Sequence, residues 1–597
     1  MMNDIWLRPD PNRPKLESEE YKKLSSGILI DSLTRTKNLW EDRIPRVSLI
    51  VPHYTRIIKP LDVIISNSLH KNYHQETINT MRDLGINDLE EMKRAGTPVG
   101  LMRIGTPIKK AGYTVQIIDA VYEGWDNDKY YFTAEDGSII NRYGLDIADL
   151  EKRIIEQDPD IVGITVPYSH QWGNAREVAD LVKKIDSRIV TVMGGTHVSR
   201  PFGMTQDALI DSPTDYVVSK QSDIAFIELS DFLTGKSDKN IDDIDGLTYR
   251  KNGRIIDNKS REFAKASNSI LSPDYSLINM NLYSEEKHSS GLRQTNNGYN
   301  VAVFTGFGCD IACKFCTITY NQGTLFNFPI HTVDTFFKNL NNLGVREFLL
   351  ENDHFLGDPL NVLTISDIIK NYGMPWYEEG GFALFSLIGL LPNVTEGEIR
   401  NSSKKPNTYE KLIEAKRQGI TTEYLIKKLA ESGCYGGYLA VESANKESLS
   451  GSNKPTLNVN QKDTIEIIKM FKKYNMDITV GLMLGFIENS KKGLHIEQIS
   501  DIEKTIQYGK LLKDNGAAFI NPFIVTPLPG APNYLELKNY ALRNTDIGYS
   551  HEFGTMNAHN EEWNVDDMNL LRTKTLLYTN GTESFMRMRK IGTWPVG

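Results

Sequence analysis

The chain alternates short apolar, β-branched runs with amphipathic helical patterns, and this alternation constrains its fold more than any other feature. In a first series, helices are expected at Leu145–Gln157 and Asn174–Ile185. The expected strands are Arg46–Val51, Tyr113–Asp119, Asp160–Thr165, Arg188–Met193 and Thr214–Val218. Strands joined through helices run parallel, with helices on both faces of the sheet. Residues 41–235 are therefore predicted to form an α/β, doubly wound, Rossmann-like domain.

A second series of the same kind fills residues 295–540. Its expected strands are Tyr299–Thr305, Glu347–Leu350, Gly437–Val441, Met476–Leu484 and Ala518–Val525. Its expected helices are His331–Asn342, Thr422–Ser432, Gln461–Lys473 and Ile502–Lys513. Successive strand–helix units of this length predict a partial or full TIM-like (β/α) barrel.

The remaining segments carry weaker patterns. We expect an amino-terminal arm at residues 1–40, a β-hairpin and linker at 236–294, and a small mixed helical region at 541–597. Residues 376–419 form a longer connection than a barrel requires, which fits a functional loop and a solvent-exposed insertion equally well.

Composition narrows the classes of function. The 597 residues carry 68 Lys and Arg against 77 Asp and Glu, a net charge of −9 with no sustained basic run, which argues against nucleic acid as the main partner. There is no basic-then-apolar leader, and no stretch of about 18 uninterrupted apolar residues that would span a membrane. The sequence therefore predicts a cytoplasmic protein. Four cysteines in the whole chain do not support a disulfide framework.

Three of the four cysteines lie close together on one expected loop. Cys309, Cys313 and Cys316 have the spacing C-x3-C-x2-C and follow a strand and the turn Gly306–Gly308. Three thiolates at the carboxyl end of a barrel strand can hold three corners of a [4Fe–4S] cluster and leave one iron open to another ligand. Cys434 stands apart and is expected to be a small buried hydrophobic residue.

Three other interpretations of the cysteine loop stay open. A structural zinc ion takes four Cys or His ligands, so Cys434 or a distant histidine would have to join the three cysteines. A disulfide would leave an odd thiol. The third interpretation is that the cysteines only pack, although Asp310 and Lys314 make the loop polar.

With the aromatic Phe315 before its last cysteine, the loop resembles the signature of radical S-adenosylmethionine enzymes. The resemblance implies that the open iron binds the amine and carboxylate of S-adenosylmethionine. Reduction, by an electron donor of the flavodoxin or ferredoxin type, then releases a 5′-deoxyadenosyl radical. Phe315 is expected to lie beside the adenine.

Later segments of the barrel resemble the same family. Glu351-Asn352-Asp353 stands where the family handles the amino group, and Glu442, in Tyr438–Ser443, where it meets the ribose. Gly481–Gly485 resembles a further family strand, with Phe486 in the place of the usual Pro. The implied cofactor-binding residues are Phe315, Glu351, Asp353, Glu442 and Gly485.

Three of these implied cofactor-binding residues also have a purely structural interpretation. Glu442 is a strand-end carboxylate that would suit a helix N-terminus, and Asp353 would cap a helical turn at Phe355–Leu360. Gly485 would allow close approach of two backbones.

The amino-terminal domain resembles the cobalamin-binding subfamily of these enzymes. The resemblance lies in Asp160–Ser169 and in the turn Val192–His197. It implies that cobalamin contacts Thr165, Tyr168, Gly194, Gly195, Thr196 and His197. Glycines suit such a site because backbone approaches a bulky ligand only where Cβ is missing. The alternative is a Rossmann-like domain that serves docking alone.

Many cobalamin proteins place a histidine below cobalt with the motif D-x-H-x-x-G. Here Asp119–Gly124 has that spacing, but Val121 stands at the histidine position, so we expect cobalt without this ligand. His53, His170 and His197 are candidates for a contact, and the sequence assigns none of them as a ligand.

The resemblance implies a C-methyltransferase that acts on an unactivated carbon of a small molecule, through a 5′-deoxyadenosyl radical and methylcobalamin. Two other classes stay open: an enzyme of the same build that catalyses cyclisation, oxidation or rearrangement, and a non-enzymatic cobalamin or iron–sulfur sensor. A methylthiotransferase is disfavoured, because residues 1–308 contain no cysteine for a second cluster. The sequence does not name the substrate.

Overall fold

The computed structural model describes residues 44–591, apart from residues 94, 135, 200–203, 221, 252–253, 260–271, 284–298, 404, 491–492, 527, 529 and 535–559. The arm expected at residues 1–40 lies outside the described residues. The chain forms two compact units. The described residues of the first are 44–58 and 97–282, and those of the second are 59–96, 283–534 and 560–591.

The first unit is built on a sheet whose five parallel strands have the order β4-β1-β7-β8-β9. These strands are β1 (Arg46–Val51), β4 (Thr114–Asp119), β7 (Ile161–Thr165), β8 (Val190–Gly194) and β9 (Tyr216–Val218). In chain order this is 2-1-3-4-5, so the connections reverse direction between β1 and β7. The doubly wound domain predicted from the sequence is confirmed.

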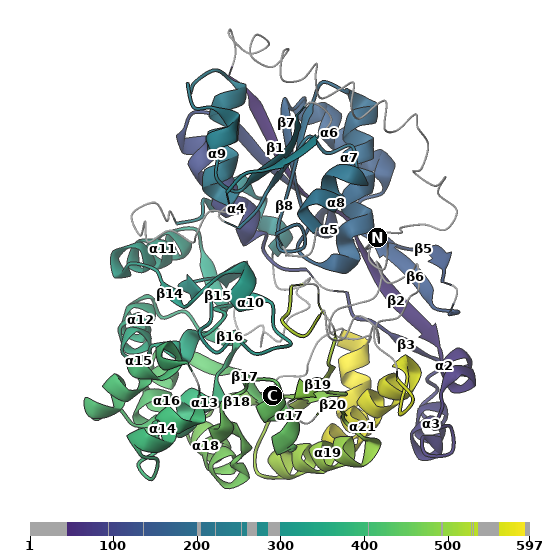
Figure 1. Ribbon diagram of the computed structural model, residues 1–597, viewed down its shortest axis with the longest axis vertical. Helices are drawn as coiled ribbons and strands as arrows, with labels where there is room; N and C mark the ends of the chain where they lie inside the picture. Colours follow the sequence, from purple (N-terminus) through teal and green to yellow (C-terminus); the bar gives the residue numbers. More distant parts are fainter. Residues whose placement is uncertain are drawn as a thin grey trace. The chain divides into compact units, whose positions relative to one another are not determined.

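Helices cover both faces of this sheet (Figure 1). On one face, Ile50 and Ile164 share a core with the apolar sides of α6, α7 and α8. On the other, Leu49 lies against α4 and α9, which also pack on each other. These helices are α4 (Val99–Lys110), α6 (Ile147–Gln157), α7 (Trp172–Ile185), α8 (Met204–Ile210) and α9 (Ser222–Leu233).

Two antiparallel features complete the first unit. The hairpin β10 (Leu247–Lys251) and β11 (Arg254–Asp257) extends the sheet from β9. A separate antiparallel group contains β2 (Tyr54–Pro60), β5 (Asp128–Thr133) and β6 (Ile139–Tyr143). The alternation of strands and helices did not predict this group, because alternation indicates parallel strands and these strands pair antiparallel.

The second unit contains a six-stranded sheet with the order β12-β15-β16-β17-β18-β21, and all of its neighbouring strands pair in parallel. Its strands are β12 (Tyr299–Val303), β15 (Val345–Leu350), β16 (Trp376–Phe382), β17 (Cys434–Glu442), β18 (Asp477–Leu484) and β21 (Phe519–Ile524). The main crossover helices are α11 (Ile330–Asn342), α12 (Pro359–Tyr372), α16 (Thr422–Glu431), α18 (Gln461–Lys473) and α19 (Ile499–Asp514). This is a partial (β/α) barrel, as predicted.

Residues 376–419 are neither a loop nor an exposed insertion, so both expectations for them were wrong. They provide β16, the third strand of the sheet, and three helices: α13 (Leu384–Gly389), α14 (Glu396–Ser402) and α15 (Pro406–Arg417). All six residues of α13 are buried. The strand was hidden in the sequence because Glu378–Gly381 interrupts its apolar pattern.

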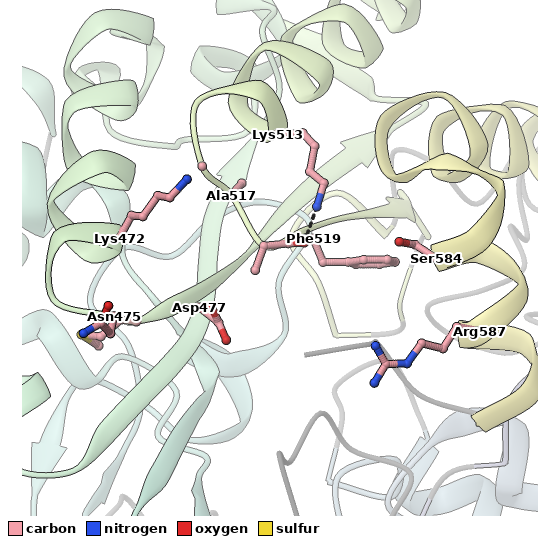
Figure 2. A pocket seen from close by; sticks show the side chains of 11 residues that line it. Lys472, Asn475, Asp477, Lys513, Ala517, Phe519, Ser584 and Arg587 are labelled. Carbon is pink, nitrogen blue, oxygen red and sulfur yellow. Dashed lines mark hydrogen bonds between the residues drawn. The ribbon is translucent and has the colours of Figure 1, made fainter. Parts of the chain in front are cut away.

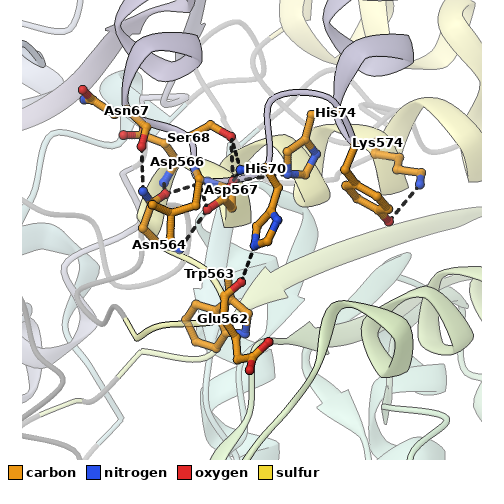
Figure 3. Close-up of polar contacts among 12 residues, drawn as sticks. Asn67, Ser68, His70, His74, Glu562, Trp563, Asn564, Asp566, Asp567 and Lys574 are labelled. Atoms are coloured by element: carbon orange, nitrogen blue, oxygen red, sulfur yellow. Dashed lines mark hydrogen bonds and ion pairs between the residues drawn. The ribbon is translucent and has the colours of Figure 1, made fainter.

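Residues 59–96 belong to the second unit, although the sequence placed them in the domain at 41–235. Helices α2 (Leu61–Asn67) and α3 (Gln75–Asp83) share a core with α21 (Val565–Ile591), in which Ile64 and Met81 are fully buried. Their junction is also polar: Asp567 accepts a hydrogen bond of 2.6 Å from the Ser68 hydroxyl (Figure 3).

The same junction holds buried charges. Lys59 Nζ lies 2.8 Å from Asp566, and His74 Nε2 lies 3.4 Å from Asp567. Burial raises the pKa of Asp567, but hydrogen bonds from His74 and Ser68 outweigh burial and lower it to about 2. These polar contacts add to the apolar core that joins α2 and α3 to α21.

Candidate active site

The cysteine loop follows β12 at the carboxyl end of the barrel strands, where enzymes of this architecture place their active sites. Its start is fixed by the two-residue strands β13 (Gly306–Phe307) and β14 (Phe326–Asn327), and Cys309 N donates to Gly323 O at 3.1 Å. Gly308 has a φ of +82°, and a Cβ there would lie 2.2 Å from the carbonyl oxygen of Thr324. A glycine is therefore required at this turn.

The three thiols are close enough to shift one another's pKa values. Cys313 is buried, and Cys309 and Cys316 are partly buried. Burial and, next, the Cys313 thiol raise the pKa of Cys316 to about 12, and burial with the other two thiols raises that of Cys309. Thiolates in such a place need a compensating positive charge, which an iron–sulfur cluster provides.

The arrangement fits a cluster better than a single ion. Among the described residues, no three His, Cys, Asp or Glu side chains converge on one ion-sized position. A tetrahedral zinc ion would require such a convergence, whereas a cubane spreads its thiolates around a larger body. Cys434 begins β17, at the opposite end of that strand from Glu442, and its buried thiol donates to Gly436 O at 3.3 Å.

Asp353 is tied directly to the cysteine loop, since its carboxylate accepts from Gly308 N at 2.7 Å. The helix cap in this region is Asp358, which accepts from Asn361 N, so the capping alternative for Asp353 was wrong. Burial raises the pKa of Asp353 to about 6. Burial and the nearby carboxyls of Glu379 and Asp353 raise the pKa of Glu351 to about 7. A bound ammonium group would keep both carboxyls ionised.

Glu442 is the last residue of β17 and has a left-handed φ of +73°. It pairs with Lys454 Nζ at 2.6 Å, and each side chain is 10% exposed, so an ion pair rather than a helix terminus holds it. Lys454 Nζ also lies 5.8 Å from the Phe315 ring. Phe486 meets that ring edge-on, with centroids 6.1 Å apart. The sequence analysis missed Lys454, which belongs to no motif.

Gly485 turns the chain after β18 with a φ of +83°, and its amide donates to Glu497 at 2.9 Å. Phe486 N donates to the same carboxylate at 3.1 Å. Glu497 is fully buried, and burial raises its pKa to about 7. Glu497 was also missed, because it lies twelve positions away in a polar stretch.

A third missed residue is His354, next to Asp353. It is 3% exposed, and neither ring nitrogen has a hydrogen-bond partner in the described residues. Burial and the charges of Lys454 and Lys411 lower its pKa to about 4, so the ring is neutral. Helix α15 also reaches the cysteine loop, since the Thr408 hydroxyl donates to Asp310 O at 3.0 Å.

The amino-terminal sheet has its own candidate site at the carboxyl ends of β1 and β7. Open α/β sheets bind ligands where strand order reverses, which is between these two strands. Val166 N donates to Gly194 O at 2.8 Å, and His197 N donates to Val166 O at 3.0 Å. These bonds bring the segments that carry Thr165, Tyr168 and Gly194–His197 together.

Contacts within the protein require a glycine at one position of this turn and leave little room for a side chain at the other. Gly195 has a φ of +108°, and a Cβ there would lie 2.8 Å from Val166 O. A Cβ on Gly194 would lie 3.2 Å from the Val218 side chain. The expected reason for these glycines was room for a ligand, and contacts within the protein independently require Gly195.

Buried polar groups lie at the start of α7, which follows the loop after β7. His197 Nδ1 lies 3.0 Å from the Ser169 hydroxyl, and Tyr168, 40% exposed, stacks on His170. Among the described residues, Gln171 Nε2, Trp172 Nε1 and Asn174 Oδ1 have no hydrogen-bond partner.

The other candidates of the amino-terminal domain have structural roles. His53 is fully buried 3.3 Å from Glu177, and burial lowers its pKa, so it is neutral. Val121 is buried in the helix α5 (Ala120–Glu123), and Asp119 caps that helix. The stretch with D-x-H-x-x-G spacing is therefore a helix start.

A cavity of about 670 Å³ lies elsewhere, at the amino ends of β18 and β21 (Figure 2). Lys472, Lys513 and Arg587 line it together with Asp477 and Phe519. The amino end of a barrel contributes stability rather than chemistry. We therefore do not assign this cavity to the reaction.

Comparison with known proteins agrees with this description. Residues 89–230 match the B12 binding domain family. The structure is similar to that of the radical S-adenosylmethionine methyltransferase TsrM from Kitasatospora setae with cobalamin and a [4Fe–4S] cluster bound. The two sequences are 13% identical, the match covers 83% of this chain and 75% of that chain, and the TM-score is 0.51. It is also similar to OxsB with aqua-cobalamin and S-adenosylmethionine bound, with 12% identity, 84% and 56% coverage, and a TM-score of 0.52. The chain has the fold of the cobalamin-dependent radical S-adenosylmethionine enzymes.

Two relatives of this protein are named as methyltransferases. An uncharacterized methyltransferase of Pyrococcus horikoshii is 26% identical over 456 residues, 75% of this chain and 79% of that protein. The cytidylyl-2-hydroxyethylphosphonate methyltransferase of Streptomyces wedmorensis is 24% identical over 470 residues, 74% of this chain and 78% of that protein. The family resemblance inferred from the sequence is confirmed. In the described part of the chain, no helix is both long and apolar enough to cross a membrane.

Proposed function

We propose that this radical enzyme is a cytoplasmic C-methyltransferase that acts on an unactivated carbon of a small molecule. The observation that carries the proposal is the loop of Cys309, Cys313 and Cys316 at the carboxyl end of the barrel, in a chain that also contains a B12 binding domain. When bound, the cluster with S-adenosylmethionine supplies a 5′-deoxyadenosyl radical, and cobalamin supplies the methyl group. An electron donor of the flavodoxin or ferredoxin type would provide the electron.

The barrel residues hold the cluster and S-adenosylmethionine. The three cysteines bind three irons, and Asp353 and Glu351 receive the ammonium group of S-adenosylmethionine, which favours their ionised forms. Glu442, fixed by Lys454, accepts from the ribose hydroxyls. Phe315 lies beside the adenine.

The amino-terminal residues hold cobalamin. Its amide side chains and ring edge suit the unpartnered polar atoms of Gln171, Trp172 and Asn174. The adjacent loops contribute Thr165, Tyr168, Gly194, Gly195, Thr196 and His197. Val121, which is buried, stands at the histidine position of the D-x-H-x-x-G spacing, so this segment would supply no ligand to cobalt.

The test is anaerobic reconstitution with iron, sulfide and hydroxocobalamin, followed by reduction with S-adenosylmethionine that carries a trideuterated methyl group. Incubation with a small-molecule extract should yield 5′-deoxyadenosine and one compound that gains a labelled methyl group. Deoxyadenosine without any labelled product would favour the enzyme class that does not transfer methyl. Absence of deoxyadenosine would favour a sensor.

A further inference from the structure

The cavity at the amino ends of β18 and β21 carries a set of charges that neither cofactor explains (Figure 2). Its volume of about 670 Å³ lies in the range of small-molecule sites, about 300–1,000 Å³. Helices α18, α19 and α21 each contribute one cation to its lining: Lys472, Lys513 and Arg587. Asp477 is the one carboxylate among its described lining residues. The cavity therefore favours an anion.

Lys472 reaches the cavity across a glycine turn. Gly516, between α19 and β21, has a φ of +117°, and a Cβ there would lie 2.9 Å from Cδ of Lys472. Among the described residues, the Lys472 ammonium group has no hydrogen-bond or ion-pair partner. The next residue, Lys473, pairs instead with Glu423. The charge of Lys472 is therefore available to a ligand.

Arg587 lines the opposite side of the cavity, on the last part of α21 (Figure 2). The Asn580 side chain accepts from Ile520 N and donates to Ile520 O, both at 2.8 Å, so α21 is fixed to β21 at this point. The next residue, Gly581, leaves helical geometry with a φ of +81°. Beyond it, Ser584 and Arg587 are three positions apart and share one side of the helix. Both line the cavity.

The Arg587 guanidinium group is not used within the described part of the protein. Glu583 stands four positions before it, where a carboxylate commonly pairs with an arginine on a helix. No ion pair joins the two, and no other described residue pairs with Arg587. Arg589, two positions later, pairs with Asp88 at 3.0 Å. Figure 2 shows Lys472 and Arg587 extending toward each other from opposite sides of the cavity, so their charges face one space.

Lys513 adds a third charge to this space. It is half-buried near the end of α19, and its ammonium group donates to Ala518 O. Burial lowers the pKa of Lys513. A bound anion would favour the charged form, so anion binding and protonation of Lys513 support each other. Met476 and Ala517 add buried apolar atoms to the lining, which suit the organic part of a ligand.

We propose that this cavity binds the diphosphate group of a phosphorylated small molecule, held between Lys472 and Arg587 with Lys513 beside them. The planar guanidinium group of Arg587 matches two phosphate oxygens at once, and the two ammonium groups act as point charges. Cations on three helices can contact more than one phosphoryl group. The site lies at the opposite end of the barrel strands from the cysteine loop, so the inference goes beyond the proposed function and holds whichever reaction the barrel catalyses.

The test measures binding of inorganic pyrophosphate to the reconstituted holoenzyme by isothermal titration calorimetry. S-adenosylmethionine is kept in excess, so its own site is filled. Pyrophosphate should bind at least about tenfold more tightly than inorganic phosphate, because it reaches more of the cations. Raising the ionic strength should weaken binding, since Lys472 and Arg587 are exposed.

Removal of single charges locates the site. Arg587→Gln should weaken pyrophosphate binding by about tenfold, and Lys472→Gln by about threefold to fivefold. Lys469→Gln is the matched control, because Lys469 is exposed on the same helix as Lys472 but does not line the cavity. All three side chains are exposed, so the urea midpoints of unfolding should not change.

Three results would overturn the proposal: no binding of pyrophosphate, no loss of affinity in the double variant Lys472→Gln with Arg587→Gln, or an equal loss in Lys469→Gln. ADP separates two sources of the diphosphate group. Tighter binding of ADP than of pyrophosphate supports a nucleotide that also uses Met476 and Ala517, and equal affinity supports a ligand recognised by its phosphates alone. None of these measurements depends on deoxyadenosine formation, so failure of the proposed function remains distinguishable.

Discussion

The two parallel sheets carry different kinds of side chain at their carboxyl ends. At the barrel, the candidate site consists of ionisable groups: three thiols, the carboxyls of Asp353 and Glu442, and the ammonium of Lys454. At the amino-terminal sheet, the loops after β7 and β8 present amides, hydroxyls, an indole and closely packed backbone. The barrel site is therefore selective by charge, and the amino-terminal site by shape and hydrogen bonding.

This difference matches the groups that each site is proposed to hold. S-adenosylmethionine carries an ammonium, a carboxylate and a sulfonium charge, so buried charges of the protein orient it. Cobalamin presents a wide ring edged by amides. Closely packed backbone can match the shape of the ring, and neutral polar groups can hydrogen-bond to the amides. Removing charges should thus affect the barrel most, and adding Cβ atoms should affect the amino-terminal turn most.

The largest effect is expected from loss of a cluster ligand. Cys309→Ala should lower 5′-deoxyadenosine formation by more than about a thousandfold, because two thiolates do not hold the cluster. Cobalamin binding, followed by its absorption spectrum, should be unchanged. Cys434→Ala is the control and should keep its full iron content, since Cys434 lies at the other end of β17. Loss of iron in the control would contradict the assignment.

Removal of Lys454 tests the charged site without touching a metal ligand. Lys454→Met leaves the Glu442 carboxylate buried without its ion pair, which should lower the free energy of unfolding by about 3 kcal/mol. The double variant Lys454→Met with Glu442→Gln should recover most of this loss, since no unpaired charge remains. Urea unfolding of the cofactor-free protein measures both. Equal losses of unfolding free energy in the single and double variants would show that lost packing, and not an unpaired charge, causes the destabilisation.

The pH dependence of stability should follow the buried carboxyls of the barrel. The pKa of Glu351 is raised from 4.5 to about 7, so the folded protein loses stability as the pH rises from below 4.5 through 7. Glu351→Gln should therefore be more stable than the unsubstituted protein at pH 8, on the order of 2 kcal/mol, and similar to it at pH 4. Denaturant unfolding without cofactors at both pH values is the measurement. A difference that is the same at both pH values would rule out titration of Glu351 as the cause.

The smallest of these effects is expected at the amino-terminal turn. Gly195→Ala puts a Cβ 2.8 Å from Val166 O at a φ of +108°, and the displaced loop should bind hydroxocobalamin about tenfold more weakly. Gly112→Ala is the matched control, because Gly112 has a φ of +90° but nothing lies within 4 Å of its Cβ position. Iron content should not change in either variant. Equal cobalamin affinity in the two variants would show that this turn does not form part of the cobalamin site.

Much of the architecture was predictable because it depends on local patterns. The strand expected at Asp160–Thr165 is observed at Ile161–Thr165, and the helix expected at His331–Asn342 is observed at Ile330–Asn342. Strand β16 was missed because two glutamates and two glycines interrupt it. Helices α2 and α3 were missed because their stability depends on α21, almost five hundred residues later.

The sequence by itself determined the order of strands and helices and the three cysteines on one loop, since periodicity and ligand spacing are properties of neighbouring residues. Tertiary structure alone decided which groups face one another: Lys454 beside Glu442, Asp353 on Gly308 N, and the Val166 loop over Gly195. It likewise placed Lys472 over Gly516, in one cavity with Arg587. Burial and pairing are fixed by contacts between segments far apart in the chain, and these contacts set both the charge of the barrel site and the shape of the amino-terminal one.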